Sequence, residues 1–277
     1  MNIFRRKLFW LGIIVLIIVV FVGWQASLKP ATTGDWQTHL ATPSTAEFNG
    51  NNITVKNIRN FRYGPTEADM HPGYYDKTFD LATLKKVWYV TEPFNGKKYA
   101  AHTFLSFEFE GDNFLSITIE ARKTKDQQYS IWKGMMKTYP LIYIAADERD
   151  VVLLRANLRK DDVFVYPVNT TKENGQKLFV DMLERMNEMQ TKPTWYNTFF
   201  ANCTSSIAYH VNRVRDDRVP FSWKVWLTGY ADELAYDVNL LDTDLSLEDA
   251  RKKYRINEKS EAAGDVPDYS VQIRKFE

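Results

Sequence analysis

The chain has 277 residues, with 36 lysines and arginines against 35 aspartates and glutamates, and it contains one cysteine. This near-balance of charge argues against a nucleic-acid binder, which usually carries a basic excess or patch. A lone cysteine cannot close an intrachain disulfide, so an ordinary hydrophobic core must hold the protein together, and the length is ample for one.

The N-terminus predicts a membrane anchor. Arg5, Arg6 and Lys7 precede the apolar run 8–24, whose length of about 17 residues is just enough to span a bilayer. Basic residues before the run predict a cytoplasmic N-terminus and an extracytoplasmic domain. A cleaved signal peptide is the alternative, but its apolar region is usually shorter, roughly 7–15 residues, and no clean small-x-small site follows the run. We therefore expect an uncleaved, single-pass anchor in the inner membrane, with the domain in the periplasm.

Composition divides the chain into five parts. Residues 1–7 are predicted to be cytoplasmic and 8–24 to cross the membrane, and the polar segment 25–45 is predicted to be a linker. A single domain is expected over 46–245. The remainder, 246–277, predicts a short charged helix and a loose tail.

Strand patterns dominate the first part of the domain and helical patterns the second. Alternating or apolar segments predict strands at 53–58, 86–92, 101–109, 114–122 and 163–167, the third and fourth forming a hairpin. Two further apolar runs, 141–144 and 151–155, are joined by the charged turn 147–150. Helical spacing is present at 173–190, 203–214 and 246–254. We expect an α+β domain with a central antiparallel sheet packed on the helix that starts at Cys203.

Cys203 is the candidate nucleophile. Asn202 is a good N-cap, and the helix that follows places Cys203 in its first turn, on the stripe of Ile207 and Val211. Partial positive charge at a helix N-terminus favours the reactive thiolate, so we expect a depressed thiol pKa. The alternative is a thiol that is packed as a small hydrophobic side chain.

The four histidines are the candidates for a general base. His39 lies in the predicted linker, and His210 lies about two helical turns beyond the cysteine, roughly 10 Å along the helix axis. His71 sits in a loop flanked by proline and glycine and remains possible. His102 is the best choice, because matching the polar faces of the hairpin places Glu120 opposite it, where a carboxylate would orient the imidazole. A plain surface ion pair is the competing interpretation.

Other side chains carry weaker signals. Phe199 and Phe200 are expected in the core. The aromatic segment 221–230, with Trp223 and Trp226, is expected either in the core or in contact with lipid. The sequence has no metal-ligand cluster, Walker-type loop or dinucleotide fingerprint, so no cofactor and no metal are predicted.

Several segments together resemble the Lnb N-terminal periplasmic domain, a family similar to the permuted branch of the papain-like NlpC superfamily that contains lecithin retinol acyltransferase. These segments are 57–61, 101–107, 116–122, 142–150, 196–198 and 202–204, in this order. The resemblance implies a permuted papain-like α+β fold, with Cys203 as nucleophile and His102 as base. It further implies an activity, since Lnb-type enzymes transfer an acyl chain from phospholipid to the N-terminal amine of lipoproteins.

Three functions stay open. In the first, Cys203 takes an acyl chain from phospholipid and passes it to an amine of a lipoprotein, with backbone N–H groups, Tyr196 or Asn202 stabilising the oxyanion and Arg122 as a further positioning candidate. In the second, water accepts the acyl group, which makes the protein an envelope amidase, peptidase or lipase; the acceptor depends on pocket shape and water exclusion. The third is an anchored binding domain without catalysis.

Overall fold

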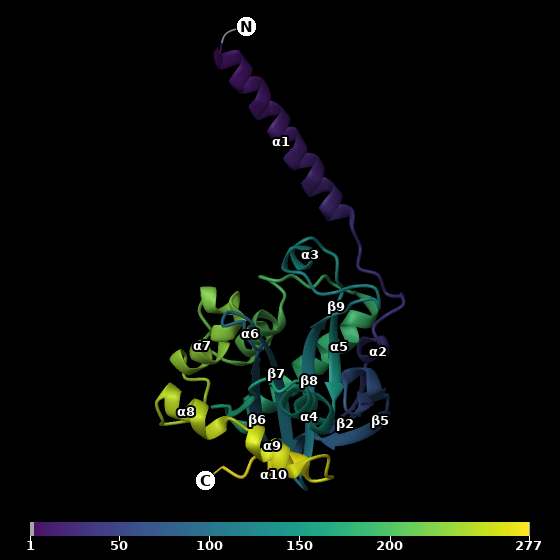
Figure 1. Ribbon diagram of the computed structural model, residues 1–277, viewed down its shortest axis with the longest axis vertical. Coiled ribbons are helices and arrows are strands. Elements are labelled where there is room, and N and C mark those ends of the chain that lie inside the picture. The colour runs from purple at the N-terminus through teal and green to yellow at the C-terminus, as the bar shows by residue number, and fades with distance from the viewer. Residues whose placement is uncertain (1–2, 277) are drawn as a thin grey trace.

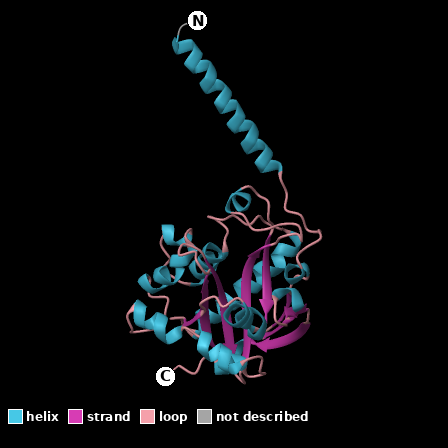
Figure 2. Cartoon of the chain, viewed as in Figure 1, coloured by secondary structure: helices cyan, strands magenta, loops and turns pink. Residues whose placement is uncertain are grey.

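The computed structural model describes residues 3–276, and it consists of one apolar helix that projects from an α+β domain (Figures 1 and 2). The helix is α1, Ile3–Ser27. Its segment Arg5–Ser27 is long and apolar enough to cross a membrane, and none of its most apolar stretch is buried against the rest of the protein. The predicted anchor is therefore a continuous helix, and the domain begins close to its end.

An eight-stranded sheet forms the centre of the domain over the described residues, in the order β1-β2-β9-β8-β7-β6-β10, with β5 also paired to β2. Its strands are β1 (Thr45–Asn49), β2 (Asn52–Arg59), β5 (Tyr74–Asp80), β6 (Leu84–Pro93), β7 (Ala101–Phe109), β8 (Asn113–Ala121), β9 (Leu141–Ala146) and β10 (Phe164–Pro167). Neighbours pair antiparallel except β2 and β9, which meet in parallel at Arg59 and Ala146. The short strands β3 (Arg62–Tyr63) and β4 (Met70–His71) form a separate ribbon.

Helices cover both faces of the sheet. The helices after α1 are α2 (Thr38–Ala41), α3 (Ile131–Met135), α4 (Glu148–Leu153), α5 (Lys172–Thr191), α6 (Cys203–Val214), α7 (Ala231–Asp237), α8 (Leu247–Tyr254), α9 (Asn257–Ala263) and α10 (Tyr269–Gln272). Side chains of a strand alternate between faces, so each strand contributes to two cores. Leu105 of β7 packs in the core that contains Ile207 of α6, whereas Phe104 packs in the core that contains Val151 of α4. We call these the α6 face and the α4 face.

The predicted pattern of strands and helices is confirmed at its strongest points. The hairpin over 101–109 and 114–122 is β7 and β8, and the helix expected over 203–214 is α6. The strands β1 and β5 were not predicted. The apolar run 151–155 is helical, because Asp147 caps α4 by accepting a hydrogen bond from the backbone N–H of Arg149 at 2.9 Å.

The segment 25–45, predicted as a linker, is packed on the domain from Trp36 onward. Trp36 and Leu40 are buried, and the carbonyls of Leu40 and Ala41 accept hydrogen bonds from the Arg122 guanidinium at 3.0 and 2.8 Å. The same guanidinium lies 4.5 Å from the centre of the Trp36 ring. The prediction of a free linker was wrong because two apolar side chains in a polar segment are enough to dock it.

The loose tail predicted beyond the helix 246–254 is also wrong. Tyr269 and Ile273 are fully buried on the α4 face, and Arg274 pairs with the buried carboxylate of Glu148. The apolar side chains here are too widely spaced in a charged sequence to give a periodic pattern. They nevertheless complete the second core, so the tail is part of the domain.

Candidate active site at the start of α6

Cys203 opens α6 behind a complete capping arrangement. The side-chain oxygen of Asn202 accepts a hydrogen bond from the Ser205 N–H at 2.7 Å, and the Ser205 hydroxyl accepts one from the Asn202 N–H at 2.9 Å. The predicted helix start is thus confirmed. The thiol is only 6% exposed, and its sulfur lies 4.0 Å from the carbonyl oxygen of Ala101 at the start of β7.

The thiol meets β7 where this strand separates from β8. The ladder between the two strands ends at the pair Phe104 and Thr118, although β7 begins at Ala101 and β8 continues to Ala121. Over this stretch β7 remains paired with β6 and β8 with β9. The start of α6 therefore lies against an opening in the sheet, between the first three residues of β7 and the last three residues of β8.

His102 lies at the same opening and is held by a hydroxyl and a carboxylate. Its Nε2 is 2.7 Å from the Thr118 hydroxyl, which donates its proton to Glu120 Oε1 at 3.1 Å. Since the hydroxyl has one proton to give, it accepts from His102, which assigns the ring proton to Nε2. Nδ1 then carries a lone pair, and it makes no hydrogen bond within residues 3–276. The Glu120 oxygen also lies 3.3 Å from Nε2, as the predicted register of the hairpin requires.

The thiol and the imidazole approach the opening from different faces of the sheet. The His102 ring packs beside Phe104, with ring centres 5.6 Å apart, and its partner Thr118 lies on the same α4 face. Cys203 belongs to the stripe of α6 that packs on the other face with Ile207. The opening between β7 and β8 is consequently the direct path between the two side chains.

Burial and nearby charges decide the resting protonation states. Burial lowers the pKa of His102 to about 4, against the raising effect of Glu120. Burial by itself would raise the pKa of Glu120, but His102 and Arg155, whose guanidinium is 3.5 Å from the carboxylate, hold it at about 2. The site therefore holds a neutral imidazole against an ionised carboxylate at neutral pH.

The thiol does not behave as the sequence led us to expect. Burial raises the pKa of Cys203, and hydrogen bonds from Thr103 only partly oppose this shift. The expectation of a depressed thiol pKa was wrong because the helix terminus acts on a sulfur that has lost nearly all of its water. At neutral pH the two groups are therefore a thiol and a neutral imidazole.

Three predicted site residues remain. Tyr196 lies near the thiol, whereas the side chains of Asn202 and Arg122 are hydrogen-bonded to backbone carbonyls. Burial, and next the proximity of Cys203, raise the pKa of Tyr196 well above its usual value. Asn202 uses both amide protons on the carbonyls of Thr198 and Val225, at 2.8 and 3.2 Å, which leaves none for an oxyanion. Arg122 is committed to the segment that contains α2.

Of the other three histidines, only His39 lies near Glu120. His210 is enclosed in the core, with Nε2 2.8 Å from the Tyr143 hydroxyl and Nδ1 2.6 Å from the Asp181 carboxylate. His71 is exposed on β4. His39, which was set aside as part of a linker, lies close enough to Glu120 for each to influence the pKa of the other, and burial followed by Arg59 lowers its pKa to about 4.

Two residues of the site were missed by the sequence analysis. Thr118 lies on the predicted polar face of its strand, two residues before Glu120, so the alternation of polar and apolar residues could have identified it as a neighbour of His102. Arg155 gave no such signal, because it lies in a π-helical turn, 154–158, that continues α4. Its guanidinium donates to the buried Glu92 at 2.5 Å as well as facing Glu120.

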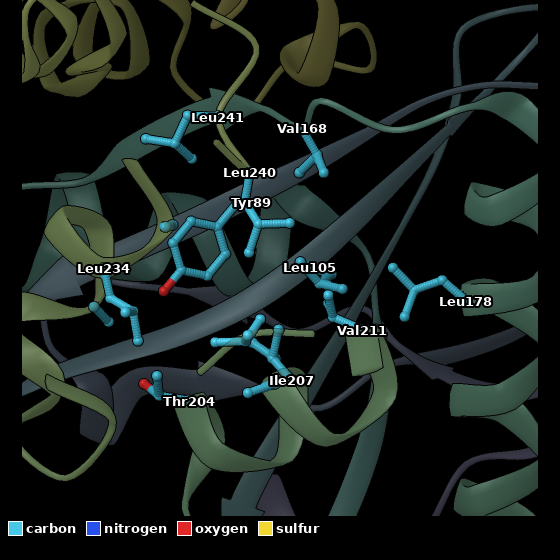
Figure 3. Close-up of a pocket in the computed structure, with 14 residues that line it drawn as sticks. Tyr89, Leu105, Val168, Leu178, Thr204, Ile207, Val211, Leu234, Leu240 and Leu241 are labelled. Atoms are coloured by element: carbon cyan, nitrogen blue, oxygen red, sulfur yellow. The ribbon is translucent and has the colours of Figure 1, made fainter. Parts of the chain in front are cut away.

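An apolar pocket lies beside the site, between α6, α7 and the sheet (Figure 3). Tyr89, Leu105, Ile207 and Leu234 surround it, and Thr204, the neighbour of Cys203, stands at its side. The cavity volume is about 50 Å³. This is well below the volume of about 150 Å³ of an engineered apolar cavity that binds benzene. Within residues 3–276, no group of three or more His, Cys, Asp or Glu side chains is placed to hold a metal ion.

Comparison with known proteins gives one match. The family model of the Lnb N-terminal periplasmic domain matches residues 71–229, more than half of the chain, and this range includes His102, Glu120 and Cys203. No curated protein and no solved structure matches the chain.

Proposed function

The chain belongs to the Lnb N-terminal periplasmic domain family, and on this premise we propose that it is a thiol acyltransferase anchored in the inner membrane. The observation that supports the proposal is the placement of Cys203 at a capped helix start against Ala101, the residue before His102, whose tautomer is fixed with Nδ1 free. A cysteine that serves only packing needs no oriented base on the strand against which it lies. The permuted papain-like assignment is part of the same proposal, since the histidine strand precedes the cysteine helix in the chain.

In the first step, the Cys203 sulfur attacks the ester carbonyl of a phospholipid while its proton passes to Nδ1 of His102. The new S–C bond forms, the C–O bond of the ester breaks, and the departing glycerol oxygen takes the proton from Nδ1. Glu120 stabilises the transient imidazolium through Thr118. The backbone N–H groups at the start of α6 and the Tyr196 hydroxyl stabilise the oxyanion.

In the second step, the N-terminal amine of a lipoprotein attacks the thioester. Its proton passes to His102, the N–C bond forms, and the S–C bond breaks to restore the thiol as it recovers a proton. A helix that anchors the domain keeps the site close to both lipid substrates, which raises their effective concentration. Water in place of the amine gives hydrolysis by the same residues.

The test begins with the intermediate. Protein purified from native membranes is expected to carry a hydroxylamine-labile mass increase of one fatty acyl chain, located on Cys203 by peptide mapping. Cys203→Ser and His102→Ala are expected to lose this adduct, whereas the control His71→Ala, which changes an exposed histidine on β4, keeps it. Full retention of lipoprotein acylation by both site variants would contradict the proposal.

The acceptor is then tested by competition. A diacylated lipopeptide with a free N-terminal amine is added to the acylated protein, and amide product and free fatty acid are measured together. Amide formation that increases with lipopeptide concentration supports the transferase. Release of fatty acid alone, at a rate that the lipopeptide does not change, assigns the site to a hydrolase.

A further inference from the structure

Large apolar side chains are exposed on three segments beside the start of α6, namely 131–132, the loop residue 200 and 221–223. Trp132 is 70%, Phe200 73% and Phe221 83% exposed, and Ile131 and Trp223 are about half exposed. We call these five residues the aromatic collar. The expectation that Phe200 lies in the core was therefore wrong. Single exposed apolar residues are normal, but a gathering of aromatic ones marks a surface that contacts something.

Direct contacts join the collar into one surface around the site. The Thr198 hydroxyl donates to the carbonyl of Ile131 at 3.0 Å, which ties the loop before Cys203 to α3. The close approach of this loop to α3 requires a glycine at position 134, because a Cβ atom there would lie 2.3 Å from the Thr198 hydroxyl oxygen. On the other side, Phe200 and Phe221 both pack edge-on against Trp226, with ring centres 5.9 and 5.2 Å away.

The collar lies at the end of the domain that faces the anchor. Figure 1 shows α3 directly beneath the end of α1, with α8, α9 and α10 at the opposite end of the domain. Two hydrogen bonds fix this arrangement: Lys137 Nζ donates to the carbonyl of Gln25 at 2.5 Å, and Trp195 Nε1 donates to that of Leu28 at 3.3 Å. The surface that carries exposed aromatic residues is thus continuous with the membrane-spanning helix.

We propose that the aromatic collar inserts into the interfacial layer of the bilayer that α1 spans, so that the opening beside Cys203 faces lipid. Tryptophan favours this layer, and the neighbouring exposed Lys133 can reach lipid phosphates while its stem lies along apolar surface. A bilayer explains the collar better than a protein partner does, because the anchor holds the collar at the lipid surface at all times. The proposal concerns membrane contact and does not depend on the chemistry proposed for Cys203.

The experiment labels the full-length chain at one position at a time. In a Cys203→Ser background, which removes the only native cysteine, Trp132→Cys and Phe221→Cys are each labelled with an environment-sensitive dye. Glu258→Cys, on α9 at the far end and with a 92% exposed side chain, is the matched control. The proteins are reconstituted into vesicles of phosphatidylethanolamine and phosphatidylglycerol with no other protein, with and without lipids that carry a quencher just below the headgroup.

Labels at 132 and 221 are expected to emit at shorter wavelength and to be quenched several-fold more than the label at 258. All three positions are exposed, so the labels leave the core intact. Equal quenching at the three positions overturns the proposal. The proposal is also overturned if labels at 132 and 221 are shielded from water in native membranes but are not quenched in vesicles that contain no other protein. That result would assign the collar to a protein partner instead.

Discussion

The Glu120→Gln substitution tests the proposed role of the carboxylate that holds His102. Glu120 is ionised beside a neutral histidine, which becomes an imidazolium only in the proposed reaction, so in that proposal the charge of Glu120 acts mainly on the transition state. At the observed 3.3 Å, an opposite pair of unit charges attracts by about 5 kcal/mol at an effective dielectric constant of 20. Arg155 lies 3.5 Å from the same carboxylate and offsets part of this attraction.

We therefore expect the substitution to raise the barrier for acyl transfer by about 2–4 kcal/mol, which is a loss of roughly 30- to 1,000-fold in rate. The assay is the initial rate of acyl transfer from phospholipid to a lipopeptide in mixed micelles, with kcat and KM determined separately. The loss should appear in kcat, because the carboxylate acts on the histidine and not on the bound lipid.

Glu108→Gln is the matched control for this measurement. Glu108 lies on β7, on the same strand face as His102, and accepts a hydrogen bond from Trp88 Nε1 at 2.8 Å, but it is six residues away from the histidine. Its substitution should change kcat less than about threefold, because a charge that is remote from the reacting atoms is screened and has little effect on them. If Glu120→Gln retained kcat to the same extent while remaining folded, the proposed role of the carboxylate would be refuted.

Three further outcomes are expected. Because burial raises the pKa of Cys203, its alkylation by iodoacetamide should still be accelerating above pH 8.5, and a rate that levels off below pH 8 would contradict the neutral resting pair. Burial lowers the pKa of His102 from 6.5 to about 4, so as the pH falls the unfolded chain binds a proton at this histidine before the folded protein does. The free energy of unfolding should therefore fall by about 3 kcal/mol from this residue as the pH drops from 6.5 to 4. Urea titrations should show a smaller fall for His102→Asn. Ile273→Ala should cost about 2–4 kcal/mol of unfolding free energy, whereas Leu245→Ala, at an exposed position, should cost little; equal effects would mean that the tail is not docked.

The sequence was most informative where backbone periodicity is strict. Side chains in a hairpin alternate between the two faces with a period of two. Once the polar face of each strand was identified, the register predicted that Glu120 is the carboxylate near His102. The observed distance to Glu120 agrees with that register. The N-cap pattern Asn202-Cys203 likewise located the start of α6 at the correct residue, because a capping side chain satisfies donors that only a helix start leaves free.

Features that depend on tertiary packing could not be obtained in this way. The early separation of β7 from β8 is not visible in the alternation. The helix-terminus argument did not include how completely the thiol is buried, so its pKa shift was predicted in the wrong direction. Arg122 was a positioning candidate, but its guanidinium is engaged by the segment that docks through Trp36 and Leu40. Both errors arise from segments that are distant in sequence and adjacent in the fold.

The opening between β7 and β8 has a consequence for how variants at Cys203 should be chosen. The side chain there lies against the start of β7, where this strand is no longer paired with β8. An alanine at this position removes that contact as well as the sulfur, so it alters the packing at the opening. Serine keeps a side chain of similar length. Only the serine variant therefore separates the loss of the sulfur from the loss of packing at the opening.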